Sequence, residues 1–431
     1  MDARRIIFFG GQGSRALSVS PFHPSEDDKA CDNAISLLLS VCHSALLQEA
    51  MQHRRREPLP AWADFDLPTN AGLLVSGNAM ASDNAILQGV ALCVHQLVAY
   101  LHFDSTLQKK RTSTLLGFCS GIVPAIVLAC SSNVQDYIQY SKEAVRLTYW
   151  IGYRAAELTA HLMPDRNLPG SWALSVFGKD RETLEADLER FNVAYGGTFN
   201  LRLATCFGKD CFTIVGPPLS LNRFRSQCLG EQHPSEAIRI HALYHAGEKG
   251  CEGLLKVLDD AHRESIQFPT LDQIKTALWT CHGNSSLDRK SLFGSSSLLE
   301  LAVRLILVDA ADLYNTWKVI TDNMLALSCD REIITVGPGS SALLVSTTQD
   351  TRTPNETKWI NLSGVGAASK SAQEGFAIVG MSVNYPGASG KDEFWALLEN
   401  GLSAMQEVRQ FHIPSMEANS TDPCLDTQLE I

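Results

Sequence analysis

Residues 113–121 read Ser-Thr-Leu-Leu-Gly-Phe-Cys-Ser-Gly, and this stretch decides the fold. Its apolar part predicts a short buried strand, and the apolar spacing of residues 120–131 predicts a helix directly after it. A Gly-x-Cys-x-Gly sequence at a strand-to-helix turn has the layout of a nucleophile elbow, with cysteine in place of serine. The flanking glycines relieve the crowded turn, and the helix N-terminus favours a thiolate. The pattern therefore predicts that Cys119 is a nucleophile and that the N–H of Ser120 is an oxyanion donor, the alternative being a buried cysteine between two glycines.

The segments on either side of this stretch predict alternating strands and helices. Residues 4–9 form an apolar strand that ends in a glycine-rich loop, and residues 332–336 form a similar strand. Residues 33–52 and 83–101 have helical spacing of Leu, Val and Ala. The sequence therefore predicts an α/β fold.

A second texture lies between these segments. Residues 166–237 contain strand and helix patterns in the order βαββαβ, which predicts a compact ferredoxin-like insert. The larger subdomain then consists of residues 1–165 and 238–345. Residues 346–374 are rich in Thr, Ser, Asn, Gly and Ala with little periodicity, which predicts a linker. A further unit is expected at residues 375–431.

Composition and charge exclude several classes of protein. With 431 residues, 45% of them hydrophobic, the chain is long enough for two to four folded units at roughly 100–200 residues each. A net charge of −11 with no basic run longer than three residues argues against a nucleic-acid partner. Apolar stretches such as residues 121–130 are shorter than the ~20 residues of a membrane helix, and the first apolar run is too short for a signal peptide. We therefore expect a cytoplasmic protein without a membrane partner.

The 12 cysteines include no Cys-x-x-Cys pair. In a chain of this length without a secretion signal, they are expected to be reduced thiols. The closest pair, Cys206 and Cys211, lies in a predicted hairpin and does not support a zinc site. No bound metal is expected.

A cysteine nucleophile needs a base, because a free thiol has a pKa of about 8.5 and is mostly protonated at neutral pH. His241 and His245 lie at the end of the predicted insert, and His282 occupies a similar strand-to-loop position. Sequence spacing cannot choose among them, because the partner of a nucleophile is adjacent in space.

Four motifs, taken together in their order, resemble the acyltransferase fold, whose large subdomain is α/β-hydrolase-like. They are Gly11-Gln12-Gly13-Ser14, the elbow at residues 117–121, Tyr244-His245-Ala246 and the turn at residues 336–339. The cysteine in the elbow is similar to one branch of this fold, the starter-unit acyl carrier protein transacylase (SAT) domains that open fungal non-reducing polyketide synthases.

The C-terminal segment carries a second resemblance. Residues 376–387, Phe-Ala-Ile-Val-Gly-Met-Ser-Val-Asn-Tyr-Pro-Gly, and residues 394–401 resemble the beginning of a ketosynthase domain. The resemblance implies that the ketosynthase and malonyl acyltransferase domains of a synthase are partners in the same chain. No ketosynthase activity is expected from this segment.

The resemblance implies roles for individual residues. Cys119 matches the nucleophile and His245 the general base and acid, while Gln12 would supply the second oxyanion N–H beside that of Ser120. Gly11 would lie against the substrate. A main-chain carbonyl near Arg304 and Leu305 would orient the histidine. No permanently bound cofactor is implied, since acyl-CoA or an acyl-phosphopantetheine is the substrate.

One departure from the family pattern bears on specificity. The resemblance implies that malonyl-selective acyltransferases carry the sequence Tyr-Trp-Arg-Gly in the helix after the elbow, where the arginine pairs with the substrate carboxylate. This chain has Ile151 in the position of that arginine. Because a buried carboxylate without a cation is unfavourable, Ile151 favours an uncharged acyl group. Arg154, almost one helical turn further on, is a possible substitute, and Ile151 as a plain core residue is the alternative.

The expected activity is the transfer of an uncharged acyl group, through an acyl-Cys119 intermediate, to the phosphopantetheine of an acyl carrier protein. The donor is either acyl-CoA or the acyl carrier of a partner reducing synthase. Two alternatives stay open: a thioester hydrolase of the same fold, and a non-catalytic docking domain.

Overall fold

The chain divides into two compact units, residues 1–368 and 369–431. The structure is a computed structural model, and it describes single residues 79, 287 and 344 together with residues 4–12, 29–76, 82–108, 113–163, 170–197, 199–230, 233–282, 295–325, 331–337 and 357–362. The expected ketosynthase-like unit lies outside the described residues. All structural statements below concern the first unit.

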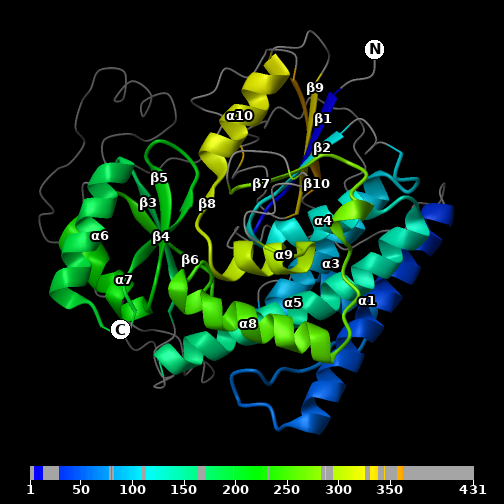
Figure 1. Cartoon of the computed structure of the whole chain (residues 1–431), viewed down its shortest axis with the longest axis horizontal. Helices are drawn as coiled ribbons and strands as arrows, with labels where there is room; N and C mark the ends of the chain where they lie inside the picture. The colour runs from blue at the N-terminus through cyan, green and yellow to red at the C-terminus, as the bar shows by residue number, and fades with distance from the viewer. Residues whose placement is uncertain are drawn as a thin grey trace, which may run out of the picture. The chain divides into compact units, whose positions relative to one another are not determined.

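A five-stranded parallel sheet forms the centre of the larger subdomain (Figure 1). Its strands occur in the order β10-β9-β1-β2-β7. They are β1 (Arg4–Phe9), β2 (Ser113–Gly117), β7 (Leu278–Thr280), β9 (Arg331–Val336) and β10 (Thr357–Leu362). Parallel strands are buried on both faces, which explains the nearly continuous apolar runs at the start of the chain and after residue 113.

Helices cover both faces of this sheet. Alternate residues of β1 point to opposite sides, so Ile7 and Phe9 pack in the main core, while Ile6 and Phe8 pack in a second core with Trp317 of α10. The main-core side carries α1 (Lys29–Arg56), α3 (Ala85–Phe103), α4 (Ile122–Cys130), α5 (Val134–Leu162), α8 (Glu248–Arg263) and α9 (Leu298–Leu307), and the opposite side carries α10 (Leu313–Leu325). Short helical turns complete the unit: η1 (Ala71–Val75), η3 (Cys119–Gly121) and η5 (Leu271–Gln273).

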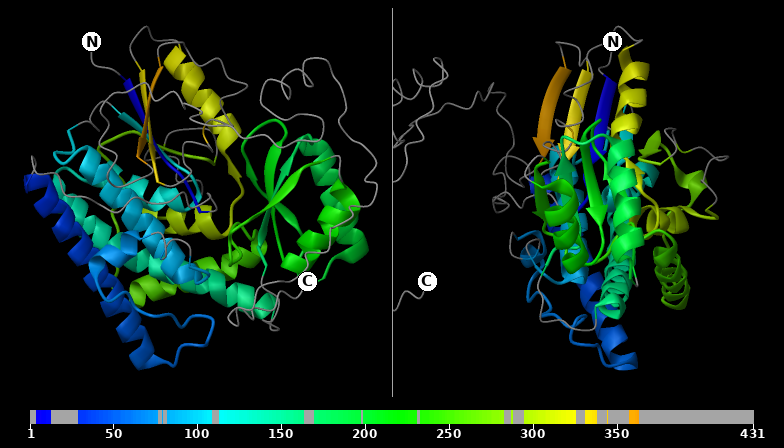
Figure 2. Two further views of the ribbon diagram at one scale, coloured as in Figure 1. Left: turned by 180° about the vertical axis from the view of Figure 1, so that it is seen from behind. Right: turned by 90° about the vertical axis from the view of Figure 1, so that its left-hand side faces the viewer.

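The predicted insert forms a second, mainly antiparallel sheet beside the first, and two views show α6 and α7 packed against it (Figures 1 and 2). Its strand order β6-β3-β5-β4 is that of a ferredoxin-like unit, as predicted. The elements are β3 (Ala173–Phe177), α6 (Arg181–Tyr195), β4 (Arg202–Cys206), β5 (Cys211–Val215), α7 (Pro218–Phe224), the π-helical turn η4 (Arg225–Leu229) and β6 (Ser235–Ile238). The short strand β8 (Ala311–Asp312), from outside the insert, pairs in parallel with β4.

The structure corrects the predicted linker at residues 346–374. Within it, β10 pairs in parallel with β9 over six residues, from Thr357 opposite Arg331 to Leu362 opposite Val336. These residues belong to the central sheet, so the linker prediction is wrong for them.

The structure also corrects the estimate of apolar helix length. By length and composition alone, α1 and α3 are each long and apolar enough to cross a membrane. In α3, however, 78% of the apolar window is buried inside the protein, and α1 contributes Ile35, Leu38 and Leu46 to the same core. The core helix of a folded unit passes such a length test, so these two helices are weak evidence for a membrane span.

Candidate active site

The strand-to-helix turn places Cys119 at the carboxyl end of β2, an interior strand of the central sheet. The N–H of Phe118 donates to the Phe9 carbonyl at 3.0 Å, which extends the pairing of β2 with β1, and the turn η3 follows at once. Cys119 has φ +51°, a conformation that is unfavourable for a residue with a side chain. Its side chain is half-buried, so it is neither sealed in the core nor fully in solvent. This geometry agrees with the elbow that the sequence predicts.

Two glycines are required by the close packing around this turn. A Cβ at Gly121 would lie 2.3 Å from the Phe9 carbonyl oxygen, and a Cβ at Gly11 would lie 2.7 Å from the Cβ of Cys119. Gly11 therefore brings the loop after β1 against the nucleophile. The side chain of Gln96 holds this loop, because its Nε2 donates to the Gly10 carbonyl at 2.7 Å.

Backbone pairing with the end of α9 positions His245. The N–H of His245 donates to the Ile306 carbonyl at 3.0 Å, and the imidazole Nδ1 lies 2.6 Å from the Asp309 carbonyl oxygen. An Nδ1–H donor to this carbonyl leaves Nε2 free to accept a proton, and Nε2 lies 3.1 Å from the Cys119 sulfur. The prediction that a carbonyl near Arg304 and Leu305 orients the histidine is therefore wrong by several residues, because the carbonyl of Asp309 does so.

Cys119 and His245 shift each other's pKa in the directions that favour a thiolate–imidazolium ion pair. Burial raises the pKa of Cys119, but His245 and the N–H groups of Ser120 and Gln12 outweigh it and bring that pKa below its ordinary value. Burial lowers the pKa of His245, while the Cys119 sulfur and the Asp309 carbonyl raise it above its ordinary value overall. By contrast, burial raises the pKa of the Cys93 thiol to about 12. The arrangement favours a thiolate beside an imidazolium.

The two other candidate histidines have different partners. His241 Nε2 lies 3.1 Å from Asp83, and His282 Nδ1 lies 3.9 Å from the carboxylate of Asp309. The structure thus brings His245, of the three, to Cys119.

A small cavity lies beside Ser120, the residue that directly follows Cys119. Its volume is about 10 Å³, the room of roughly one water molecule. No charged side chain lines it; the lining residues are Gln12, Gly89, Cys93, Ser120, Val123, Thr148, Ile151, Gly152, Tyr244 and Ile306. Ile151, which the resemblance to the family places at the substrate, lines this cavity.

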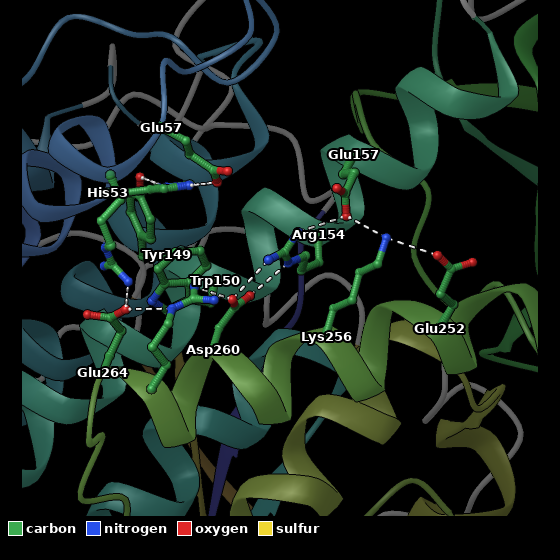
Figure 3. Close-up of polar contacts among 12 residues, drawn as sticks. His53, Glu57, Tyr149, Trp150, Arg154, Glu157, Glu252, Lys256, Asp260 and Glu264 are labelled. Atoms are coloured by element: carbon green, nitrogen blue, oxygen red, sulfur yellow. Dashed lines mark hydrogen bonds and ion pairs between the residues drawn. The ribbon is translucent and has the colours of Figure 1, made fainter.

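Arg154 does not supply a cation to that cavity in place of the arginine that malonyl-selective enzymes have. Figure 3 shows its guanidinium reaching Asp260 on α8 and Glu157 on its own helix. Its Nε and Nη2 donate to the two Asp260 oxygens at 2.7 and 2.9 Å, and Nη1 donates to Glu157 at 3.0 Å. Burial lowers the pKa of Arg154, but these carboxylates raise it above its ordinary value overall. Its charge is already neutralised by protein groups.

Two features of the site have no distinctive sequence signal. The orienting group is a backbone carbonyl at Asp309, and any residue type could supply it. The clamp of Gln96 on the loop after β1 comes from a helix remote in sequence. In the described part of the chain, ten cysteines form no disulfide bond, and no three His, Cys, Asp or Glu side chains gather as a metal site requires.

Comparison with protein families gives two matches. The family described as "Starter unit:ACP transacylase in aflatoxin biosynthesis" matches residues 8–245, and "Beta-ketoacyl synthase, N-terminal domain" matches residues 373–425. The first match covers more than half of the chain.

Similar curated proteins are fungal synthases. Orsellinic acid synthase ArmB of Armillaria ostoyae is 27% identical over 96% of this chain. The conidial yellow pigment biosynthesis polyketide synthase of Emericella nidulans is 22% identical over 94% of this chain. The chain spans about a fifth of the length of these relatives, 20% and 19% respectively.

Solved structures establish the fold. Malonyl-CoA:acyl carrier protein transacylase of Helicobacter pylori superposes with a TM-score of 0.59 at 15% identity, over 84% of this chain and 95% of that one. The corresponding enzyme of Mycobacterium tuberculosis gives a TM-score of 0.54 at 14% identity, over 84% and 97%. The chain has the acyltransferase fold.

We expect Gly121→Ala to destabilise the protein, because its Cβ would meet the backbone of β1, which cannot rotate away. The expected loss in the free energy of unfolding is about 1–3 kcal/mol, measured by urea denaturation. Gly197→Ala is the control, since nothing lies within 4 Å of a Cβ there. Equal denaturation midpoints for the two variants would contradict the close packing of the elbow.

We expect the Cys119 thiolate to form at a lower pH than an ordinary thiolate. His245→Ala removes the charge and hydrogen bond that lower its pKa and leaves the effect of burial, so the midpoint must move to higher pH. The measurement is the pH titration of thiolate absorbance near 240 nm, taken as the difference between each protein and its Cys119→Ser counterpart. An unchanged midpoint in His245→Ala would show that the imidazole does not stabilise the thiolate.

Proposed function

Because the chain belongs to the starter unit:ACP transacylase family, we propose that it moves an uncharged acyl group from a thioester donor to the phosphopantetheine thiol of an acyl carrier protein. The observation that carries the proposal is the 3.1 Å approach of His245 Nε2 to the Cys119 sulfur in an acyltransferase fold. A sulfur nucleophile paired with an imidazole is suited to exchange between thioesters.

In the first half-reaction, the Cys119 sulfur attacks the carbonyl carbon of the donor thioester. The N–H groups of Ser120 and Gln12, which both face the sulfur, stabilise the oxyanion, and each such donor is typically worth ~10²–10³ in rate. The tetrahedral intermediate collapses with cleavage of the donor C–S bond, and the imidazolium of His245 gives its proton to the leaving thiolate. The products are acyl-Cys119 and the free donor thiol.

In the second half-reaction, the carrier thiol gives its proton to His245 and attacks acyl-Cys119. The Cys119 C–S bond breaks, the acyl group is left on the carrier, and the resting thiolate–imidazolium pair returns. The hydrogen bond to the Asp309 carbonyl keeps Nε2 directed at the sulfur in both steps.

A thioester hydrolase would use the same residues with water as the acceptor. Family membership favours the carrier thiol over water, and a non-catalytic docking domain would not need a thiol with a lowered pKa beside an oriented imidazole. The partition of acyl-Cys119 between water and the carrier thiol distinguishes the transferase from the hydrolase.

The cavity beside Ser120 is proposed to hold the acyl group, because Ser120 directly follows Cys119. Its lining carries no cation for a malonyl carboxylate, and its small volume of about 10 Å³ favours a short acyl group over a long one. We therefore assign a two-carbon acetyl group, delivered by acetyl-CoA, as the preferred starter. A long reduced chain from a partner synthase would require Ile151 and its neighbours to move.

The remaining parts of the proposal follow from the relatives. The acyl carrier protein and the ketosynthase and malonyl acyltransferase domains are proposed as partners in the same cytoplasmic polypeptide, since fungal polyketide synthases match this chain. The enzyme needs no resident cofactor for thioester exchange.

Wild-type protein incubated with acetyl-CoA is expected to gain one acetyl group in its intact mass, at Cys119, and to pass it to holo acyl carrier protein. Cys119→Ala is expected to lose the acyl-enzyme and to lower transfer by at least ~10³-fold, as nucleophile removal does in other acyl-transfer enzymes. Transfer that survives in Cys119→Ala would exclude the covalent route, and release of free acetate in place of acetyl carrier would favour the hydrolase.

Among acetyl-, butyryl-, hexanoyl- and malonyl-CoA, we expect acetyl-CoA to give the highest kcat/KM. Ile151→Ala enlarges the cavity and is expected to raise the hexanoyl-to-acetyl ratio about tenfold, the effect of roughly one or two methylene groups. Val145→Ala is the control, because Val145 is buried on the same helix without lining the cavity. A wild-type preference for hexanoyl or malonyl groups would contradict the assigned acyl group.

A further inference from the structure

A second cysteine, Cys281, lies at the end of the strand beside the one that carries the nucleophile. Strands β2 and β7 pair in parallel, and their last registered pair is Gly117 opposite Thr280. One further step along both strands puts Cys281 opposite Phe118, the residue before Cys119. With strands about 4.8 Å apart and an advance of about 3.3 Å per residue, this register corresponds to roughly 6 Å between the two cysteine α carbons. A disulfide bond joins α carbons about 4.4–6.8 Å apart, so the backbone spacing suits one.

The Cys281 side chain is turned toward the strand that carries the nucleophile. Its thiol lies 3.9 Å from the carbonyl oxygen of Gly117, two residues before Cys119. Both cysteines also contact one apolar cluster, which includes Phe118 and Phe207. Cys281 is a buried member of this cluster, and the half-buried Cys119 packs against it. The two side chains therefore meet the same apolar surroundings.

The two thiols differ in reactivity. Cys119 is half-buried and has a pKa below the ordinary value of a thiol, so it is the thiolate that an oxidant reaches first. Burial raises the pKa of Cys281, and the charges of Asp312 and Cys119 raise it further. The contribution of Cys119 shows that the two groups interact. An accessible thiolate next to a protonated thiol is the arrangement of an oxidisable cysteine with a resolving partner.

We propose that Cys119 and Cys281 form a site of reversible oxidation, which a hydroperoxide converts into a disulfide bond. The acyl-transfer steps give Cys281 no role. The proposal rests on the two thiols and on no acyl substrate, so it goes beyond the proposed function.

The oxidation has two steps. In the first, the Cys119 thiolate attacks an oxygen of hydrogen peroxide, the O–O bond breaks, and the imidazolium of His245 protonates the departing hydroxide. In the second, the Cys281 thiol attacks the sulfur of the Cys119 sulfenic acid, the S–O bond breaks, and the thiol proton leaves with the hydroxide as water. The two cysteines lose two electrons, and the peroxide is reduced to two waters. Acyl transfer then stops until a thiol reductant opens the disulfide bond.

The test treats the reduced protein with hydrogen peroxide, blocks the remaining thiols with N-ethylmaleimide and maps the unreduced peptides by mass spectrometry. We expect a crosslink between the peptides that carry Cys119 and Cys281, and a loss of acetyl transfer in proportion to it. Dithiothreitol is expected to remove the crosslink and to restore nearly all of the activity.

Cys281→Ser removes the resolving thiol and leaves the nucleophile in place. Its hydroxyl can keep the hydrogen bond to the Gly117 carbonyl, so the untreated variant is expected to transfer acetyl groups at the wild-type rate. After peroxide, we expect sulfinic or sulfonic acid at Cys119, and dithiothreitol is expected to restore less than about a tenth of the activity.

Cys93→Ser and Cys211→Ser are the matched controls. Cys93 lines the cavity beside Ser120, and Cys211 packs against the same apolar cluster as Cys119. Both variants are expected to form the crosslink and to recover with dithiothreitol as the wild type does. Circular dichroism before treatment checks that all three variants are folded.

A crosslink from Cys119 to Cys93 or Cys211 would overturn the proposal, because another thiol would then be the resolving partner. Sulfinic acid at Cys119 of the wild type without a crosslink would also overturn it. The crosslink is detected by mass and needs no activity. A Cys119–Cys281 crosslink in a protein that transfers no acetyl group would therefore support this proposal and contradict the proposed function, so the two failures are distinguishable.

Discussion

The contact between the Cys119 sulfur and the His245 imidazole is the interaction on which the arrangement of the unit depends. The two residues are 126 positions apart in the chain, and each is held in a left-handed backbone conformation, at φ +51° and +52°. The central sheet fixes the sulfur through the turn after β2, and the end of α9 fixes the imidazole through paired backbone bonds. Strain at both positions is tolerated because packed elements surround them.

Helix α5 separates two electrostatic environments. Ile151 faces the uncharged cavity beside Ser120, whereas Arg154, three residues later, binds the buried Asp260 of α8 and the half-buried Glu157. Removal of one partner from such a network would leave an uncompensated buried charge, so the network holds Arg154 in place. The charged face anchors α5 to α8, and the apolar face lines the cavity beside Ser120.

Local patterns in the sequence predict much of this structure. The elbow at Cys119 could be predicted because strand, turn and helix are contiguous, and the insert because its βαββαβ order occupies one stretch. Features that depend on distant pairing could not be predicted. The segment around Trp359 resembles a linker until β9 is available beside it, and the carbonyl of Asp309 has no side-chain signature. Only the resemblance to the family distinguishes His245 from His241 and His282, because sequence spacing does not report proximity in space.

The position of β10 at the edge of the sheet has a consequence for biosynthesis. Its six residues follow β9 by about twenty positions and add to the side of the sheet opposite β7. During translation, the backbone donors and acceptors on that side of β9 stay unpaired until residue 362 has left the ribosome. The nascent chain therefore exposes an unpaired strand edge while residues 337–362 are synthesised, which is the interval in which a chaperone would protect it from aggregation.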